Sequence, residues 1–182
     1  MNMNLNIKVV VVGELQTNCY IIDKGDSVLI IDPGADAELI ASNVPSNKRV
    51  VGIVITHSHA DHTGAFLPLL DKYCCPLYNQ HNLAEGKHVV ENFSFDVIHT
   101  PGHLDDSITL YFKEEKIMFV GDFIFKGGIG RTDLPGASPY DMKLSLKKIL
   151  TYPDDITLFP GHYQATVLAN ERQNIEYFMS NL

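Results

Sequence analysis

The sequence is poor in cysteine and has no long apolar run. Its three cysteines, Cys19, Cys74 and Cys75, are odd in number and form no Cys-x-x-Cys pair. We therefore expect no disulfide framework and a reducing, cytoplasmic location, with Cys74 and Cys75 in the core. No apolar run approaches the roughly 20 residues that a membrane-spanning helix needs. The first residues, MNMNLNIKVVVV, are typical of a strand rather than of a signal peptide.

Positive charge is also scarce. Fourteen lysines and arginines stand against 22 aspartates and glutamates, which gives a formal net charge of −8 at pH 7. Nucleic-acid binding depends on clustered basic residues that neutralise phosphates, so this balance argues against a nucleic-acid partner. We expect a small-molecule substrate and neither a nucleic-acid nor a membrane partner, and the sequence leaves the oligomeric state open.

The 182 residues are predicted to form one domain, residues 1–182, with an α/β fold. Apolar and β-branched runs bounded by turn signals predict strands, and apolar residues at helical spacing predict helices. The predicted strands are 7–12, 19–23, 28–31, 50–55, 94–99, 107–112, 116–120 and 156–159. The predicted helices are 35–42, a segment that follows His62 and runs through Leu70, 139–150, and 165–179. Strands precede helices in both halves, which suggests two similar halves packed sheet to sheet with helices outside.

Side chains that commonly bind metals follow four of the predicted strands. The segment Thr56–His62 follows the strand 50–55, and Thr-Pro-Gly-His103, Val-Gly-Asp122 and Phe-Pro-Gly-His162 follow three later strands. Strand ends with glycine-containing turns direct side chains toward a shared mouth. A single histidine is more often structural, but burying three imidazoles and a carboxylate from one short segment without a ligand is costly. The pattern therefore predicts a metal site.

These clusters hold enough side chains for a dinuclear centre. Neutral imidazole suits zinc, iron or manganese, and a carboxylate can bridge two ions. In an extended segment His57 and His59 lie on the same side and can hold one ion, whereas His62 can face a second. We expect two divalent ions, zinc in the first place, with iron or manganese as alternatives.

The sequence offers no rival nucleophile for hydrolysis. It has no Gly-x-Ser-x-Gly motif, and no cysteine lies in the four clusters. Two cations that share a water lower its pKa toward neutrality, which favours attack on a carbonyl carbon by a metal-bound hydroxide. Thioesters suit such a site because a thiolate leaves readily without a strong acid.

The motifs resemble those of the metallo-β-lactamase-fold hydrolases, and in particular of the glyoxalase II-like (hydroxyacylglutathione hydrolase-like) branch. The segments that carry the resemblance to this branch are Asn18–Tyr20, Ile31–Gly34, Thr100–His103, Gly130–Leu134 and Phe159–His162. The resemblance spans nearly the whole chain. It implies an αββα sandwich with the metal site at one edge of the sheets, and hydrolysis of S-acylglutathione or a related acyl thioester.

The same resemblance implies a role for each polar residue of the clusters. It implies that His57, His59 and His103 hold the first metal. It implies that Asp61, His62 and His162 hold the second metal and that Asp122 bridges both. Asp61 and Asp122 are the catalytic carboxylates in this interpretation.

Two departures from the glyoxalase II pattern concern the substrate. Those enzymes carry a C-terminal helical domain that helps bind glutathione, and we expect it to be lacking here because the sequence stops at Leu182. Tyr163-Gln164 also follow His162 where relatives commonly have Gly-Pro or Glu-Tyr. Both differences favour loose specificity for the thiol half of the substrate.

Several residues near the clusters have two interpretations. Arg131 could bind a substrate carboxylate or pair with Asp133. Tyr163 could line the substrate pocket or be a buried packing residue, and Asp32 could orient a metal ligand or serve only in a turn. The three histidines that fit no cluster are expected to be solvated or structural; they are His81, His88 and His99.

Four other functions compete with thioester hydrolysis. A sulfur (persulfide) dioxygenase of the same fold would use a single iron. A β-lactamase is less favoured without an export signal, and a nuclease of this fold would be expected to show a more basic surface. A non-catalytic metal-binding module would be indicated by a missing ligand, and no ligand of the set is missing.

Overall fold

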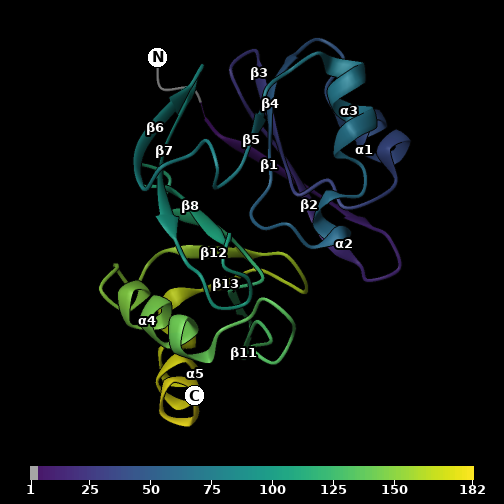
Figure 1. Cartoon of the computed structure of the whole chain (residues 1–182). Helices are drawn as coiled ribbons and strands as arrows, with labels where there is room; N and C mark the ends of the chain where they lie inside the picture. The colour runs from purple at the N-terminus through teal and green to yellow at the C-terminus, as the bar shows by residue number, and fades with distance from the viewer. Residues whose placement is uncertain (1–3) are drawn as a thin grey trace.

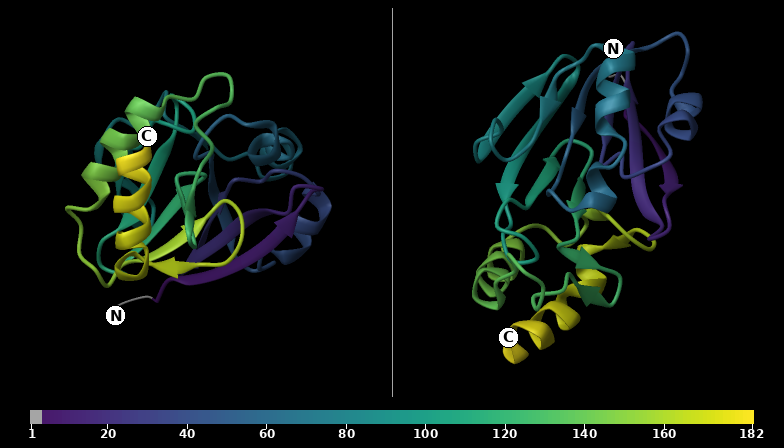
Figure 2. Two further views of the ribbon diagram at one scale, coloured as in Figure 1. Left: turned by 90° about the horizontal axis from the view of Figure 1, so that it is seen from below. Right: turned by 45° about the vertical axis from the view of Figure 1, so that its right-hand side comes forward.

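The computed structural model describes residues 4–182 and shows four layers, with two β-sheets packed face to face between two pairs of helices (Figures 1 and 2). The first sheet has the strand order β1-β2-β3-β4-β5 and the second β13-β12-β9-β8-β7-β6, while β10 and β11 form a separate hairpin. In the left view of Figure 2, α4 and α5 lie on one side of the sheets and α1 and α3 on the other. The predicted αββα fold class is confirmed.

The strands and helices have the following bounds. The strands are β1 (Asn6–Val12), β2 (Thr17–Lys24), β3 (Ser27–Ile31), β4 (Arg49–Val54), β5 (Leu77–Tyr78), β6 (Gly86–Val90), β7 (Phe93–His99), β8 (Ile108–Phe112), β9 (Ile117–Gly121), β10 (Ile124–Phe125), β11 (Gly128–Ile129), β12 (Thr157–Pro160) and β13 (Thr166–Val167). The helices are α1 (Ala37–Asn43), α2 (Ala60–Thr63), α3 (Phe66–Tyr73), α4 (Pro139–Ile149) and α5 (Leu168–Asn181). None of the helices in residues 4–182 is both long and apolar enough to cross a membrane.

Alternating side chains of the central strands build three apolar layers. In β3, Leu29 and Ile31 belong to the cluster between the two sheets, whereas Val28 and Ile30 belong to the cluster beneath α1 and α3. Successive side chains of a strand point to opposite faces, so an entirely apolar strand such as β3 is stable only with both faces covered. A third cluster, which includes Met118 of β9, packs beneath α4 and α5.

The strand directions bring the predicted metal residues to one edge of the sandwich. In the first sheet β3 and β4 are parallel. In the second sheet β9 and β12 are parallel, and β7 runs the same way because both β7 and β9 are antiparallel to β8. The residues that follow the carboxyl ends of β4, β7, β9 and β12 can therefore meet.

Some predicted elements differ from those observed. His62 itself lies in a short helix, α2, and the helix predicted after it begins only at Phe66 as α3, because the chain turns at Gly64, where a Cβ atom would lie 2.3 Å from the carbonyl oxygen of Gly34. The last predicted helix begins only at Leu168, because Thr166–Val167 pair with β12 as β13. The strand β6 was not predicted, since its first three residues, Gly-Lys-His, carry no apolar pattern.

The expectation that Cys74 and Cys75 are core residues is wrong for Cys74, whereas Cys75 packs at the edge of the cluster beneath α1 and α3. Cys74 is exposed and Cys75 half-buried. Cys74 ends α3 in the left-handed conformation, with φ 49°, and its amide donates a hydrogen bond to the carbonyl oxygen of Leu70. A helix end with this geometry turns the chain away from the core, which explains the exposure.

Candidate metal centre

All seven residues that the resemblance implied as ligands come together at one edge of the sandwich. Most of them follow the end of a strand. His57 and His59 follow β4, His103 follows β7, Asp122 follows β9 directly and His162 follows β12, whereas Asp61 and His62 lie in α2. The site thus joins residues from both sheets. Their role as ligands stays a prediction, which the geometry below supports.

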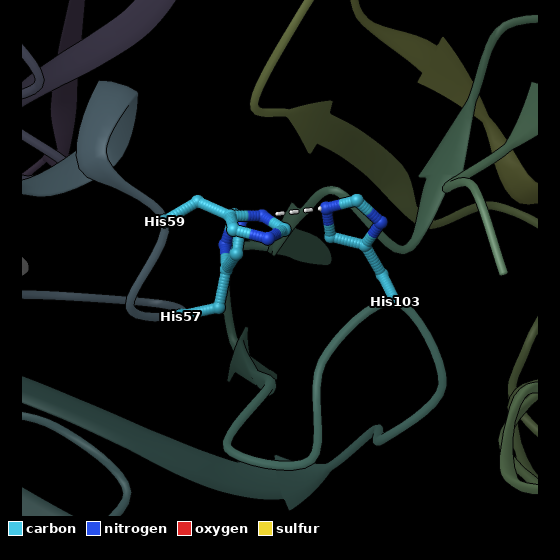
Figure 3. Close-up of side chains that lie close together, drawn as sticks. All are labelled: His57, His59 and His103. Carbon is cyan, nitrogen blue, oxygen red and sulfur yellow. Dashed lines mark hydrogen bonds between the residues drawn. The ribbon is translucent and has the colours of Figure 1, made fainter. Parts of the chain in front are cut away.

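The first cluster consists of His57, His59 and His103, whose candidate ligand atoms lie within 4.8 Å of one another. Figure 3 shows the three rings turned toward a common point, with His57 and His59 on one segment and His103 on another. His59 Nδ1 and His103 Nε2 are 2.9 Å apart. This cluster agrees with the expectation that His57 and His59 hold one ion together.

The second cluster consists of Asp61, His62 and His162, whose candidate ligand atoms also lie within 4.8 Å of one another. Asp61 Oδ2 lies 3.2 Å from His162 Nε2 and 3.5 Å from His62 Nε2. Two imidazoles and a carboxylate are suitable ligands for zinc, iron or manganese.

Asp122 lies between the two clusters. Its Oδ2 is 3.5 Å from His103 Nε2 in the first cluster and 3.5 Å from His162 Nε2 in the second. Its Oδ1 is 3.3 Å from His62 Nε2. A carboxylate in this position can contact two ions at once, as a bridging ligand must.

Three buried atoms at the centre lack hydrogen-bond partners among the described residues: His57 Nε2, His62 Nε2 and Asp122 Oδ1. Unsatisfied buried polar atoms are costly, and their clustering at one point calls for an explanation. Two bound cations, one at each cluster, would satisfy all three. The residues therefore fit the two metal ions that the sequence predicts.

The charges of the centre also suit cations. The pKa of His57 is well below its usual value, because burial and the neighbouring His62 both oppose its protonation. Burial also opposes protonation of His62, but Asp32 and Asp122 outweigh it and raise its pKa to about 10. Asp122 and Asp61 raise the pKa of His162 to about 9. Without metal, protons on these two imidazoles balance the ionised carboxylates.

The two aspartates of the centre stay ionised. A hydrogen bond from His162 holds the pKa of Asp61 well below its usual range, against the effect of burial. Burial raises the pKa of Asp122, but His162 and His62 outweigh burial, so the pKa of Asp122 also lies far below its usual range. Two permanent carboxylates at one point attract divalent cations.

Asp32 orients His62 from behind. Its buried carboxylate accepts hydrogen bonds from Thr56 N at 2.7 Å and Thr56 Oγ1 at 2.6 Å, and Oδ2 lies 2.9 Å from His62 Nδ1. With Nδ1 donating to Asp32, His62 turns Nε2 toward Asp122. The sequence left the role of Asp32 open between a turn and a ligand-orienting residue, and these contacts favour the second.

The other ligands have supports of the same kind. His103 Nδ1 donates to the carbonyl oxygen of Arg131 at 2.9 Å, and His162 Nδ1 to that of Leu15 at 3.1 Å. Thr17 Oγ1 donates to Asp61 Oδ2 at 3.0 Å. Neither Thr17 nor Thr56 was predicted as a support, and the sequence signal for Thr56 was its position directly before His57.

Asn18 fastens the loop that carries His162. Its side-chain amide donates hydrogen bonds to the carbonyl oxygens of Pro160 at 3.0 Å and Tyr163 at 2.7 Å. Its backbone amide donates a hydrogen bond to the carbonyl oxygen of Gly161 at 2.7 Å. A side chain at Gly161 would collide with the centre, because a Cβ there would lie 2.3 Å from Asp122 Oδ1. The loop therefore packs directly against the centre.

A cavity of about 490 Å³ opens over the centre. Besides metal-centre residues, it is lined by Leu15, Phe125, Ile129, Arg131, Leu134 and Tyr163. The interpretation of Tyr163 as a buried packing residue is wrong: it is 74% exposed, because its backbone adopts the left-handed conformation with φ 65°. Its ring meets Phe125 edge to face at the cavity wall, with centroids 5.6 Å apart.

Of the two interpretations of Arg131, the structure shows the pairing with Asp133, whereas binding of a substrate carboxylate stays a prediction. Its guanidinium forms a two-point ion pair with Asp133, with both N–O distances 2.9 Å, on the exposed side of the cavity. Arg131 also lines the cavity. Within residues 4–182, His81, His88 and His99 belong to no candidate metal group, in line with their expected structural or solvated role.

Comparison with known proteins places these features in a family. The sequence model of the Metallo-beta-lactamase superfamily matches residues 12–88 and 83–162. The "Probable metallo-hydrolase YqgX" of Bacillus subtilis is 31% identical over 90% of this chain and 93% of its own. The "Hydroxyacylglutathione hydrolase GloC" of Haemophilus influenzae is 28% identical over 97% of this chain and 99% of its own.

Two solved structures resemble this one closely. The BLEG-1 B3 metallo-beta-lactamase superposes with a TM-score of 0.85 and 28% identity, over 95% of this chain and 99% of its own. TTHA1623 in a di-iron-bound form superposes with a TM-score of 0.83 and 31% identity, over 92% of this chain and 98% of its own.

Proposed function

The chain belongs to the metallo-β-lactamase superfamily, and from this premise we propose that it hydrolyses small-molecule thioesters, S-acylglutathiones or related acyl thioesters, with two bound divalent metal ions. The observation that carries the proposal is the position of Asp122. Its carboxylate lies between two His-containing clusters, beside buried atoms that lack hydrogen-bond partners, at the base of an open cavity.

When bound, two divalent cations supply a hydroxide near neutral pH and polarise the carbonyl oxygen of the substrate. The chain's own residues prepare the site for this chemistry. Asp32 and the carbonyl oxygens of Arg131 and Leu15 orient the imidazoles of His62, His103 and His162. Asp61 and Asp122 supply the negative charge that compensates the cations.

The cavity wall supports a thioester substrate of moderate size. Phe125, Ile129 and Leu134 offer apolar contact for an acyl or thiol chain, and the guanidinium of Arg131 offers donors for a carboxylate. The relative from Haemophilus influenzae is named a hydroxyacylglutathione hydrolase, and this chain spans 99% of it. The proposed specificity for the thiol half is loose, because Arg131 is engaged with Asp133 and few polar groups line the wall.

Zinc is the proposed metal in the first place. Imidazole and carboxylate ligands suit zinc, but they suit iron and manganese as well. The relative solved in a di-iron-bound form supports iron as the alternative. We further propose a cytoplasmic location, which the three free cysteines Cys19, Cys74 and Cys75 support.

The test combines metal analysis with a thioester panel. Protein purified without added metal is analysed for zinc, iron and manganese, and thiol release is measured with S-lactoylglutathione and with an acyl thioester that lacks carboxylates. We expect hydrolysis of both. Arg131→Ala should raise KM for S-lactoylglutathione and leave KM for the other thioester unchanged. Lys113→Ala, far along the second sheet, is the charge-matched control.

A persulfide dioxygenase is the second candidate. The specific observation in its favour is that His57, His59 and His103 form a cluster of their own, which with Asp122 could hold a single iron. Oxygen consumption with glutathione persulfide, combined with no release of thiol from any thioester, would assign the chain to this reaction. Tight metal binding without either activity would instead indicate a non-catalytic metal-binding module.

A further inference from the structure

Glu171, far from the candidate ligands in sequence, is a buried carboxylate that the proposed chemistry does not use. It lies on α5 and its side chain is almost fully buried. Its Oε2 accepts hydrogen bonds from Gly127 N at 2.8 Å and Asn174 Nδ2 at 2.9 Å, and its Oε1 accepts one from Thr166 Oγ1 at 2.6 Å. Buried carboxylates with several donors are costly to remove and strongly directional.

One of these donors lies in the hairpin that lines the cavity, and another lies in the strand that pairs with β12. Gly127 lies at the tip of the β10–β11 hairpin, in the two-residue turn between Phe125 and Gly128. Thr166 lies in β13, which pairs with β12, and β12 leads into the loop of His162. One carboxylate therefore joins the tip of the hairpin to the strand pair behind His162.

The hairpin begins and ends at the metal centre. It follows Asp122, and after β11 the chain returns to Gly130, where a Cβ atom would lie 1.8 Å from the carbonyl oxygen of Asp122. The next residue, Arg131, accepts the hydrogen bond of His103. The hairpin also brings Phe125 and Ile129 into the cavity wall.

The strands of the hairpin pack against the cluster beneath α4 and α5 through Ile124 and Ile129, and at the tip the amide of Gly127 has Glu171 as its hydrogen-bond partner. A Cβ atom at Gly127 would meet nothing within 4 Å, and Gly127 adopts the left-handed conformation with φ 78°. A two-stranded hairpin is only marginally stable without further contacts. The hydrogen bond from Gly127 N to Glu171 therefore limits the positions that the hairpin can adopt.

We propose that Glu171 is a positioning residue for the substrate cavity. By binding Gly127 N and Thr166 Oγ1 with one carboxylate, it holds the β10–β11 hairpin against the His162 loop and sets the place of Phe125 beside Tyr163. The effect on catalysis rests on the proposed function, because it acts through a cavity wall that contacts the substrate.

The kinetic test compares variants of the metal-loaded protein. Glu171→Ala should raise KM for the best thioester by about fivefold or more, with kcat and metal content close to those of the wild type, because the wall and not the centre is disturbed. Glu171→Gln should restore the wild-type KM, since its amide oxygen can accept from Gly127 N while its NH2 group donates to Thr166 Oγ1. Glu176→Ala, an exposed position on the same helix, is the control.

A second readout does not depend on catalysis. The sequence has no tryptophan, so Phe125→Trp introduces a single fluorophore on the hairpin. In this background Glu171→Ala should increase quenching of the fluorophore by acrylamide, whereas Glu176→Ala and Glu171→Gln should not. The measurement is informative even if no thioester is hydrolysed, so failure of the proposed function and failure of this proposal are distinguishable.

Several outcomes would overturn the proposal. One is equal quenching in Glu171→Ala and Glu176→Ala. Another is a parallel loss of kcat, metal content and Tm in Glu171→Ala, which would mark a purely structural role. If Glu171→Ala does not fold, Glu171→Asp decides: its carboxylate is one methylene too short to reach Gly127, so wild-type quenching there would also overturn the proposal.

Discussion

Asp122 contacts imidazoles of both clusters, and a single substitution there should affect both ions. We expect Asp122→Ala to reduce the metal content from about two equivalents per chain to less than about one, and to abolish thiol release. Atomic absorption on the purified protein measures the change. Asp105→Ala, an exposed aspartate near His103, is the control. Unchanged metal content in Asp122→Ala would show that Asp122 does not bridge.

Asp32 permits a mild substitution because of its backbone. Its φ is 52°, in the left-handed region that asparagine also tolerates, so Asp32→Asn should fold. It should weaken metal affinity by about 10- to 100-fold, the usual effect of removing a group that orients a ligand. A competition titration with a chelating dye measures the affinity. Asp36→Asn is the control, because Asp36 is exposed and has a similar backbone conformation, with φ 55°. Equal metal affinities in the two variants would contradict the role of Asp32.

At the scale of elements, β2 holds the loop after β12 through the buried side chain of Asn18. Asn18→Ala leaves the carbonyl oxygen of Tyr163 without its side-chain donor, and that of Pro160 with the Tyr20 hydroxyl alone. We expect the free energy of unfolding to fall by about 1–3 kcal/mol, and Tm by about 3–10 °C. Thermal unfolding followed by circular dichroism measures this, with the exposed Asn47→Ala as control. Equal Tm values for the two variants would mean that the loop is held by other contacts.

The same elements show which parts of the fold could be predicted. Strands such as β3 and β9 are continuous apolar runs because both faces are buried, and this pattern is visible in the sequence. The two-residue strands β10, β11 and β13 carry no periodicity, because they exist only through pairing with distant or neighbouring segments. The break between α2 and α3 arises from the approach of Gly34 to Gly64, a tertiary contact.

At the scale of the whole molecule, metal binding should release protons. In the metal-free protein the pKa of His62 is raised to about 10 and that of His162 to about 9, so both are protonated at neutral pH and must lose a proton to bind metal. We expect release of about two protons per chain on saturation with zinc at about pH 7.5. Titration calorimetry in two buffers of different ionisation enthalpy measures the number. Identical enthalpies in both buffers would contradict it.

The raised pKa values also predict how stability depends on pH. A group with a folded-state pKa above its unfolded value of about 6.5 stabilises the fold below that pH and loses this effect as the pH rises through the folded pKa. The Tm of the metal-free protein should therefore fall as the pH rises from about 7 to about 10. The zinc-loaded protein, whose imidazoles carry no proton to lose, should change less over the same interval. A metal-free Tm that rises over the interval would contradict the prediction.

The candidate ligands were predictable as a set, whereas their supports were not. His57, His59 and His62 lie close in sequence after an apolar strand, and His103, Asp122 and His162 repeat the same position after later strands. Thr17, Asn18 and Glu171 act across the molecule through hydrogen bonds to residues far along the chain. Such contacts leave no local pattern, so only the folded structure shows them.

The joining of both sheets at one centre has a consequence for biosynthesis. A growing chain on the ribosome exposes His57, His59, Asp61 and His62 early, but the second cluster needs His162, which follows the pairing of β12 with β9. A nascent chain or a truncated translation product that stops before β12 contains no complete second cluster. If each cluster holds an ion, as proposed, only copies whose synthesis has passed His162 can hold both ions, and holding both would distinguish these copies from unfinished ones.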